Sequence, residues 1–215
     1  MTFTLYWRKR TGAFAPAALL AEARQRWTGV YVDSAKGENL TAEYKRLNPM
    51  ARIPTLILPD GQVMTESLAM VLHLAEFFEE AELLPPVGDR ERPQALRWLA
   101  FGAVNLYETD LRLTFPDRYT AATDGAEGVR QAARRDFDRQ WAMVGDALEQ
   151  RGEGPFFLGR RYSALDPYYA MLAAWHERPK ELLARYPRLA ALVEATVARP
   201  AIAPLWHAYD LDRDL

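Results

Sequence analysis

The segment from Asn48 to Ser67 limits the possible folds of this chain more than any other stretch. Pro54 opens a short apolar run, and Asp60-Gly61 then forms a turn signal before a second short run. Because proline has no backbone N–H to donate, it occurs in strands at first positions, at edges or at bulges. We therefore expect a β-hairpin that starts at Pro54 and leaves the backbone of Ile53 free to pair with something other than a strand of this protein.

Glu66 and Ser67 stand where the helix after this hairpin would begin. The unpaired N–H groups at a helix start bind anions, and an acidic side chain beside them suits a ligand that carries both charges. An amino-acid terminus, with its ammonium and carboxylate groups, is such a ligand. The alternative is that the pair only starts the helix, where acids and hydroxyls are common.

Composition excludes several classes of function. The 215 residues include no cysteine, which rules out disulfides, thiolate metal sites and a protein thiol, so a ligand would have to bring the sulfur for any thiol chemistry. The three histidines are too dispersed to predict a metal site, and a net charge of -2 gives no reason to expect nucleic acid. No apolar run approaches the roughly 18 residues of a membrane span, and the N-terminus lacks the apolar core of a signal peptide. We expect no membrane contact and a cytoplasmic location.

The first part of the chain combines strand and helix patterns. Aromatic and β-branched runs predict strands at 3–7 and 30–32, and helical spacing of apolar residues predicts helices at 14–26, with Trp27 extending its apolar stripe, at 41–47 and at 66–80. A strand, a helix and a second strand imply a parallel pair. With the hairpin at 55–58 and 62–64, the order βαβαββα predicts an α/β thioredoxin-like domain with a four-stranded mixed sheet over residues 1–82.

The second part is predicted to be all-α. Two prolines and a glycine within 83–91 mark a linker, and beyond it the strand signals vanish. Apolar periodicity predicts helices at 92–113, 128–149, 168–175, 186–197 and 201–209, followed by a charged tail at 211–215. Ser163 and Asp166 have the spacing of a helix-capping box, so we assign them to folding. The all-helical domain is expected to cover residues 92–215.

Four motifs carry a resemblance to a known family. They are the Asn48-Pro49 turn, the Arg52-Ile53-Pro54-Thr55-Leu56 segment, the Glu66-Ser67 pair, and the Ser163-Ala164-Leu165-Asp166 box. In this order and spacing, on either side of a Pro-Pro linker, the chain resembles the cytosolic glutathione transferase family over essentially its whole length. The resemblance implies glutathione as co-substrate, no tightly bound cofactor or metal, an acceptor pocket supplied largely by the helical domain, and a homodimer.

The resemblance also implies a glutathione site. Pro54 should carry a cis peptide bond that presents the Ile53 backbone to the cysteinyl part of glutathione, while Glu66 and Ser67 match the pair that grips the γ-glutamyl end. Lys36 and Arg52 sit where the family often places a cation for the glycine carboxylate. The implied glutathione-binding residues are Ile53, Pro54, Glu66, Ser67, Arg52 and Lys36.

The residue that activates the thiol is less obvious. The family uses a Tyr or Ser hydroxyl, or a Cys, in or just after the first strand. Alignment of Ala15-Pro16 with the bacterial cysteine-using branch places Gly12 where that branch has Cys. The nearest hydroxyl is that of Thr11, which we take as the catalytic candidate, with Tyr6 as the competitor.

The acceptor pocket is expected between the first loop and the helix at 92–113, and to be apolar. Its candidate residues are Trp7, Phe14, Trp98, Phe101, Asn105, Tyr107, Leu111 and Phe115, although an aromatic stripe at this spacing also fits a bundle core. The leading hypothesis is a detoxifying glutathione transferase that adds the glutathione thiolate to a small hydrophobic electrophile. The alternatives are a catalytically silent glutathione-binding or protein-interaction module, and a glutathione-dependent peroxidase or dehalogenase.

Overall fold

The computed structural model describes residues 2–215. The elements of the first half are β1 (Phe3–Trp7), α1 (Phe14–Glu22), β2 (Trp27–Tyr31), η1 (Glu38–Leu40), α2 (Ala42–Leu47), β3 (Thr55–Ile57), β4 (Val63–Met64), α3 (Ser67–Phe77) and η2 (Glu79–Ala81). Those of the second half are α4 (Arg92–Phe101), η3 (Gly102–Tyr107), α5 (Glu108–Thr114), η4 (Pro116–Tyr119), α6 (Ala126–Glu149), α7 (Leu165–Trp175), α8 (Pro179–Arg185), α9 (Pro187–Val197) and α10 (Ala203–Ala208). None of the helices in this described part is both long and apolar enough to span a membrane.

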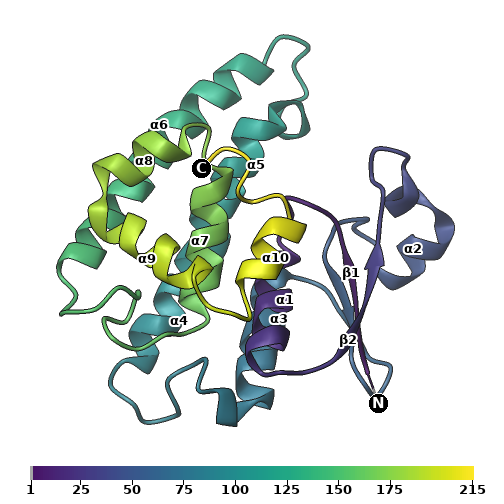
Figure 1. Ribbon diagram of the computed structural model, residues 1–215. Coiled ribbons are helices and arrows are strands. Elements are labelled where there is room, and N and C mark those ends of the chain that lie inside the picture. The colour runs from purple at the N-terminus through teal and green to yellow at the C-terminus, as the bar shows by residue number, and fades with distance from the viewer. Residues whose placement is uncertain (1) are drawn as a thin grey trace.

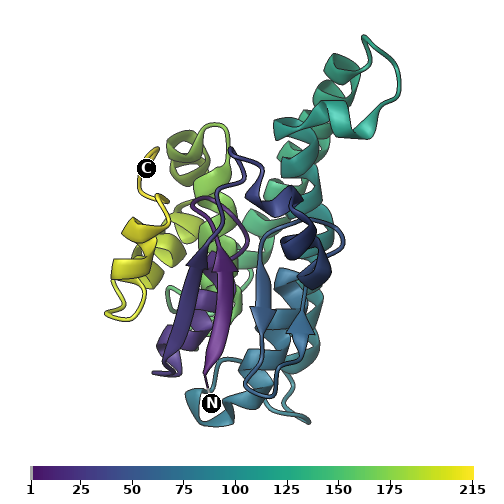
Figure 2. The same cartoon turned by 90° about the vertical axis from the view of Figure 1, so that its right-hand side faces the viewer.

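The first half is built on a mixed sheet with strand order β2-β1-β3-β4 (Figure 2). β1 and β2 run parallel with Phe3 opposite Trp27, as the strand, helix and strand order predicts. β3 is antiparallel both to β1, where Leu5 faces Leu56, and to β4, where Leu56 faces Met64. The thioredoxin-like topology expected from the sequence is therefore confirmed.

Helices cover both faces of the sheet, with α1 and α3 toward the helical half and α2 on the far side (Figure 1). Phe3 and Leu5 of β1 are buried on the α1 and α3 face, where Phe3 contacts Phe77 at 5.9 Å between ring centroids. Tyr6 packs against Tyr44 of α2 at 5.8 Å. Alternation along β1 thus directs Tyr6 away from the helical half.

The first helix is shorter than its apolar spacing suggests. α1 ends at Glu22, and Arg24 takes a left-handed conformation with φ 52°, which stops a helix. Trp27 is the first residue of β2 rather than part of the helical stripe, so that prediction is wrong. The helical spacing of apolar residues continues past the turn at Arg24 as far as Trp27. Trp27 nevertheless adopts a β conformation, because it pairs with Phe3 of β1.

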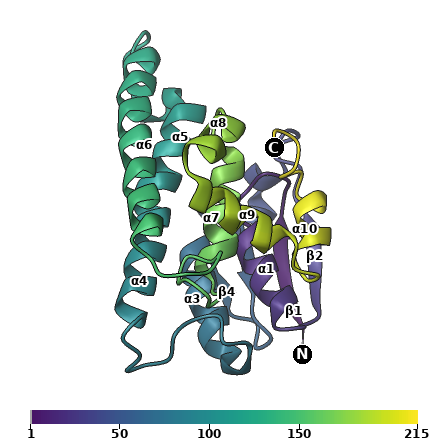
Figure 3. The same ribbon diagram turned by 60° about the vertical axis from the view of Figure 1, so that its left-hand side comes forward.

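In the second half, α4, η3 and α5 follow one another along the long helix α6, and α7 lies in the middle (Figure 3). The predicted helix at 92–113 is present, but its centre, Gly102–Tyr107, is π-helical. Gly102 permits close packing there, because a Cβ at this position would lie 3.3 Å from the ring of Tyr168. No helix or strand lies between Ala81 and Arg92, while the domain boundaries themselves stay a prediction.

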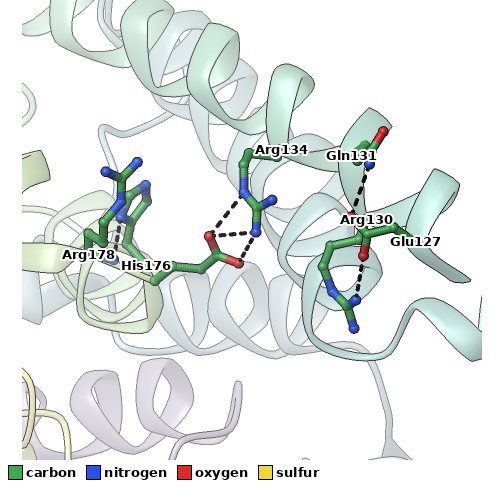
Figure 4. A network of polar contacts seen from close by, with 7 residues as sticks. Glu127, Arg130, Gln131, Arg134, His176 and Arg178 are labelled. Atoms are coloured by element: carbon green, nitrogen blue, oxygen red, sulfur yellow. Dashed lines mark hydrogen bonds and ion pairs between the residues drawn. The ribbon is translucent and has the colours of Figure 1, made fainter.

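One helix of the bundle was not predicted: α8 begins with Pro179 at its first turn and directly follows the end of α7. Polar contacts hold this corner against α6 (Figure 4). The Arg134 guanidinium donates to both carboxylate oxygens of Glu177, at 3.0 and 3.2 Å. The backbone N–H of Arg178 donates to His176 Nδ1 at 3.0 Å, so the turn between α7 and α8 is held by its own His176 and by the ion pair with α6.

The C-terminal segment, predicted as a short helix at 201–209 and a charged tail at 211–215, folds back onto the first half. Trp206 of α10 contacts Phe14 of α1 at 5.5 Å between ring centroids, and Leu211 is fully buried. The backbone N–H of Arg10 donates to the Tyr209 carbonyl at 3.0 Å, and its guanidinium pairs with Asp214 at 3.1 Å. The tail therefore positions the loop that follows β1.

Candidate functional site

The segment before β3 is held by a small buried polar network. Asn48, at the end of α2 and 2% exposed, donates from Nδ2 to the Arg52 carbonyl at 2.9 Å and to Thr55 Oγ1 at 3.2 Å. The Tyr44 hydroxyl donates to the same Arg52 carbonyl at 2.7 Å. The peptide bond between Ile53 and Pro54 is cis, as the family resemblance implies. These bonds fix the position of the Ile53 backbone at the edge of a cavity.

The start of α3 forms the opposite wall of this cavity. Glu66 adopts φ 65° and ψ 107°, a conformation that costs an L-residue on the order of 1–3 kcal/mol and is found mainly at functional sites. Ser67 is the first helical residue, and its Oγ lies 3.2 Å from the hydroxyl of Tyr168 on α7. The helix start, with its unpaired N–H groups, is thus joined to the helical half by one hydrogen bond.

The first cavity has a volume of about 100 Å³ and lies between the two halves of the chain. Its walls are the Asn48–Pro54 segment, the start of α3, the η3 and α5 helices, and α7. The lining residues are Asn48, Arg52, Ile53, Pro54, Glu66, Ser67, Leu68, Ala103, Tyr107, Glu108, Leu111 and Tyr168.

A second cavity of about 350 Å³ adjoins the first one. It is lined by Arg8, Arg10, Thr11, Ser34, Asn39, Ala51, Arg52, Ile53, Tyr107, Asp110, Leu111, Thr114, Phe115, Arg118 and Trp175. Arg52, Ile53, Tyr107 and Leu111 line both cavities. The two cavities therefore lie side by side, with these four residues at their junction.

Tyr107 occupies the junction between the cavities. Its ring packs edge-on against Trp175 at 5.0 Å, and its hydroxyl oxygen lies 2.9 Å from the position that a Cβ would take at Gly12. Burial raises the pKa of Tyr107 well above its ordinary value, and the neighbouring Tyr168 raises it further. The phenol consequently stays protonated at neutral pH.

The second cavity carries more charge than the apolar acceptor pocket that the sequence predicts. Four arginines, Arg8, Arg10, Arg52 and Arg118, contribute to its lining, together with Asp110. Burial raises the pKa of Asp110 to about 7, with Arg10 acting in the opposite direction. Arg8 and Arg10 reach the cavity from the loop after β1, which the C-terminal segment contacts, while Arg52 precedes β3 and Arg118 belongs to η4.

The structure brings most of the predicted glutathione-binding residues together. Ile53, Pro54, Glu66, Ser67 and Arg52 all line the first cavity. Lys36 does not line either cavity: its side chain is 77% exposed, and its Nζ pairs with Asp33 at 3.2 Å. Of the two cations expected near the glycine carboxylate, Arg52 is therefore the one placed beside the Ile53 backbone.

The two hydroxyl candidates for thiol activation lie in different places. Thr11 lines the second cavity, but its Oγ1 donates to the Arg8 carbonyl at 2.7 Å, which commits its proton to the backbone. Tyr6 lines neither cavity, because it packs beneath α2 on the far face of the sheet.

Three of the predicted acceptor residues, Tyr107, Leu111 and Phe115, line the second cavity. The other five lie elsewhere: Trp7 against Tyr209, Phe14 fully buried against Trp206, Trp98 and Phe101 against each other, and Asn105 off both linings. Trp7 and Phe14 serve the core because the C-terminal segment covers the first loop, whereas Trp98 of α4 packs against Phe157 inside the helical half. The π-helical turn changes the helix phase, so regular spacing could not place Asn105.

Several lining residues were not predicted from the sequence. Tyr168 was expected only as part of a buried helix, and its contact with Ser67 depends on how α7 packs against α3. Trp175 and Arg118 come from the end of α7 and from η4, respectively. A local pattern in the sequence would not have identified these residues.

The fold and the site define a class of proteins in which a thioredoxin-like half with a cis-proline loop meets a helical half across two adjoining cavities. Comparison with known proteins specifies the family. The family model for the N-terminal domain of glutathione S-transferases matches residues 15–76. A glutathione transferase structure from Methylococcus capsulatus strain Bath is 32% identical, with a TM-score of 0.79 and coverage of 98% of this chain and 100% of that one.

Two curated relatives cover most of the chain as well. Glutathione S-transferase GstA of Escherichia coli O157:H7 is 25% identical over 92% of this chain and 94% of its own length. A probable maleylacetoacetate isomerase of Vibrio cholerae is 28% identical over 92% of this chain and 91% of its own length. The chain belongs to the glutathione transferase family.

Proposed function

We propose that this protein is an enzyme that binds glutathione between its two halves and adds the thiolate to an electrophilic acceptor held in the second cavity. The observation that carries the proposal is that two cavities meet beside the cis Ile53–Pro54 segment, where they share four lining residues. One end offers Glu66 and Ser67 to an amino-acid terminus. The other end is wide enough for a second reactant.

Each part of glutathione has a matching group in the first cavity. The N–H groups at the start of α3 and the Ser67 hydroxyl suit the γ-glutamyl carboxylate, since charge-assisted hydrogen bonds are among the strongest available. Glu66 suits the ammonium group, the Ile53 backbone suits the cysteinyl peptide, and Arg52 suits the glycine carboxylate. This arrangement directs the thiol toward the junction of the cavities.

The reaction requires the thiolate, because a free thiol with a pKa near 8.5 is mostly protonated at neutral pH. The thiol proton leaves to solvent, and the sulfur lone pair forms a carbon–sulfur bond with the acceptor while a leaving group departs. Thr11, near the start of α1, and Tyr6 are the hydroxyls proposed from the sequence, and Thr11 is the one that lines the cavity.

The arginines of the second cavity support an acceptor that carries an anionic group, in place of the purely hydrophobic one expected from the sequence. Arg118 stacks over Phe115 at 3.9 Å, which places a cation beside an apolar surface. An aromatic carboxylate matches both features. A comparison of a neutral aryl halide with its carboxylated analogue tests this directly, and equal kcat/KM values would contradict it.

The proposed function is tested by a thermal shift with glutathione followed by an activity assay. Glutathione at about 100 times its Kd should add roughly 2.7 kcal/mol to the stability, which corresponds to a rise in Tm of roughly 5–11 °C for a chain of this size. Stabilisation with turnover supports the transferase. Stabilisation without turnover supports a silent glutathione-binding module, and the absence of both contradicts a glutathione site.

We also propose that the protein forms a homodimer. Apolar side chains are exposed in the loop before β3, on α3 and in η3: Met50 is 66%, Phe77 57% and Val104 65% accessible. Covering such residues is favourable, and the family resemblance points to the same assembly. Sedimentation of the purified protein tests the proposal, since a monomer at micromolar concentration would contradict it.

A role in detoxification and a cytoplasmic location stay predictions from the sequence.

A further inference from the structure

Gly12 marks the place where the first loop lacks a functional side chain. It follows Thr11 and lies just before α1, at the position where the bacterial cysteine-using branch carries its cysteine. A Cβ built at Gly12 would meet the Tyr107 hydroxyl at 2.9 Å, the Tyr107 ring at 3.1 Å and the Ser67 Cβ at 3.3 Å. The space that a side chain of residue 12 would occupy is therefore filled by the phenol of Tyr107.

The Tyr107 hydroxyl lies beside the place where the glutathione sulfur is expected. Tyr107, Ile53 and Arg52 are among the residues that line both cavities, so they surround the passage between the γ-glutamyl end and the acceptor. If the cysteinyl residue pairs with the Ile53 backbone, as the proposed glutathione site requires, its side chain extends into this passage.

The other candidate hydroxyl groups donate elsewhere or lie away from the passage. Thr11 Oγ1 donates to the Arg8 carbonyl at 2.7 Å, while Ser67 and Tyr168 line only the first cavity, at the γ-glutamyl end. Tyr6 is on the far face of the sheet. Tyr107 is thus the hydroxyl that combines position at the junction with access to both cavities.

We propose that Tyr107, contributed by the helical domain, is the catalytic residue whose hydroxyl donates a hydrogen bond to the glutathione thiolate in place of the side chain missing at Gly12. This inference rests on the proposed glutathione site. It assigns the activating group to the second half of the chain, whereas the sequence predicts it in the first strand or in the loop that follows.

The protonation state of Tyr107 suits this role. Burial, and then the nearby Tyr168, raise the pKa of Tyr107, while the Gly12 backbone amide opposes the shift; Asp110 raises the pKa further and Arg52 lowers it. A phenol that stays protonated across the neutral range can donate a hydrogen bond to the thiolate. Because it remains neutral, it does not repel the negative charge of the sulfur. The edge contact with Trp175 holds the ring in place.

The test is Tyr107→Phe, which retains the ring and its packing but removes the hydroxyl. The pKa of glutathione bound to the protein is read from the ultraviolet absorbance of the thiolate as a function of pH. Loss of one hydrogen bond to a charged group should raise that pKa by roughly one to two units. Turnover at neutral pH should fall about tenfold, while the Kd for total glutathione, measured below the thiol pKa, should change little.

Tyr169→Phe is the matched control. Tyr169 is fully buried in α7 and donates to the Trp98 carbonyl at 2.8 Å, away from both cavities. Loss of this hydrogen bond should lower Tm and leave the pKa of the glutathione thiol unchanged. The control therefore separates an effect on the thiol from a loss of protein stability. If Tyr107→Phe does not fold, Gly12→Ala provides the second test, because the added Cβ displaces the Tyr107 hydroxyl and should also raise the thiol pKa.

The outcomes distinguish this inference from the proposed function. If the wild-type protein does not bind glutathione, the proposed function fails. If it binds glutathione with a lowered thiol pKa, and folded Tyr107→Phe or Gly12→Ala protein shows the same pKa, the assignment of Tyr107 is overturned. A raised thiol pKa after Thr11→Ala with no change after Tyr107→Phe would assign the role to Thr11.

Discussion

Replacement of Asp166 by alanine should destabilise the protein strongly without altering glutathione binding. Asp166 is fully buried near the start of α7, where its carboxylate accepts from the backbone N–H groups of Phe157 and Ser163, both at 2.7 Å, and from Ser163 Oγ at 3.2 Å. Asp166→Ala leaves two buried N–H groups without an acceptor, each at a cost of about 1–3 kcal/mol. The free energy of unfolding should therefore fall by about 4 kcal/mol, which corresponds to a fall in Tm of roughly 8–16 °C.

The pH dependence of this loss gives a second check. Burial raises the pKa of Asp166 from its ordinary 3.8 to about 7, so the native state favours the protonated carboxyl. The stabilisation from this preference is present at acidic pH and is lost as the pH rises through about 7, so the difference between wild type and variant should shrink over that range.

Urea unfolding at several pH values, together with the KM for glutathione, tests the structural role. Ser163→Ala is the control, because it removes only the 3.2 Å contact and should cost about 0.5–1.5 kcal/mol. A variant of Asp166 with unchanged Tm and a raised KM would refute the reasoning and place this residue in the binding site.

Three further results are expected. Ser67→Ala should weaken glutathione binding roughly 10- to 150-fold in a titration, since one charge-assisted hydrogen bond of about 1.5–3 kcal/mol is lost; unchanged affinity would remove Ser67 from the site. Asp110→Asn should reduce the decline in unfolding free energy as the pH rises through about 7, because the raised pKa of Asp110 favours the protonated form in the native state; an unchanged pH profile would contradict this. Glu22→Gln should lower Tm, because the carboxylate of Glu22, 9% exposed, binds Arg199 at 2.6 and 2.7 Å and joins the two halves; an unaltered Tm would show that this pair contributes nothing.

The sequence was a good guide wherever short segments specify their own structure. Apolar runs bounded by turn residues predicted β1, β3 and β4, and the prolines near residue 85 preceded a part of the chain that is helical. Periodicity was less reliable at element ends: it carried the first helix past Arg24, and it gave no sign of the π-helical turn before Tyr107. In both places, pairing or packing with distant residues decided the conformation.

The candidate site divides in the same way. The sequence by itself determined the cis-proline loop and the acid and hydroxyl at the start of α3, because these motifs lie within one hairpin and one helix start. Only the tertiary structure placed Tyr107 beside Gly12, Tyr168 beside Ser67, and the arginines of the first loop in the second cavity. Those contacts join segments far apart in the chain, and they depend on how the helical half packs against the sheet half, which a local pattern does not record.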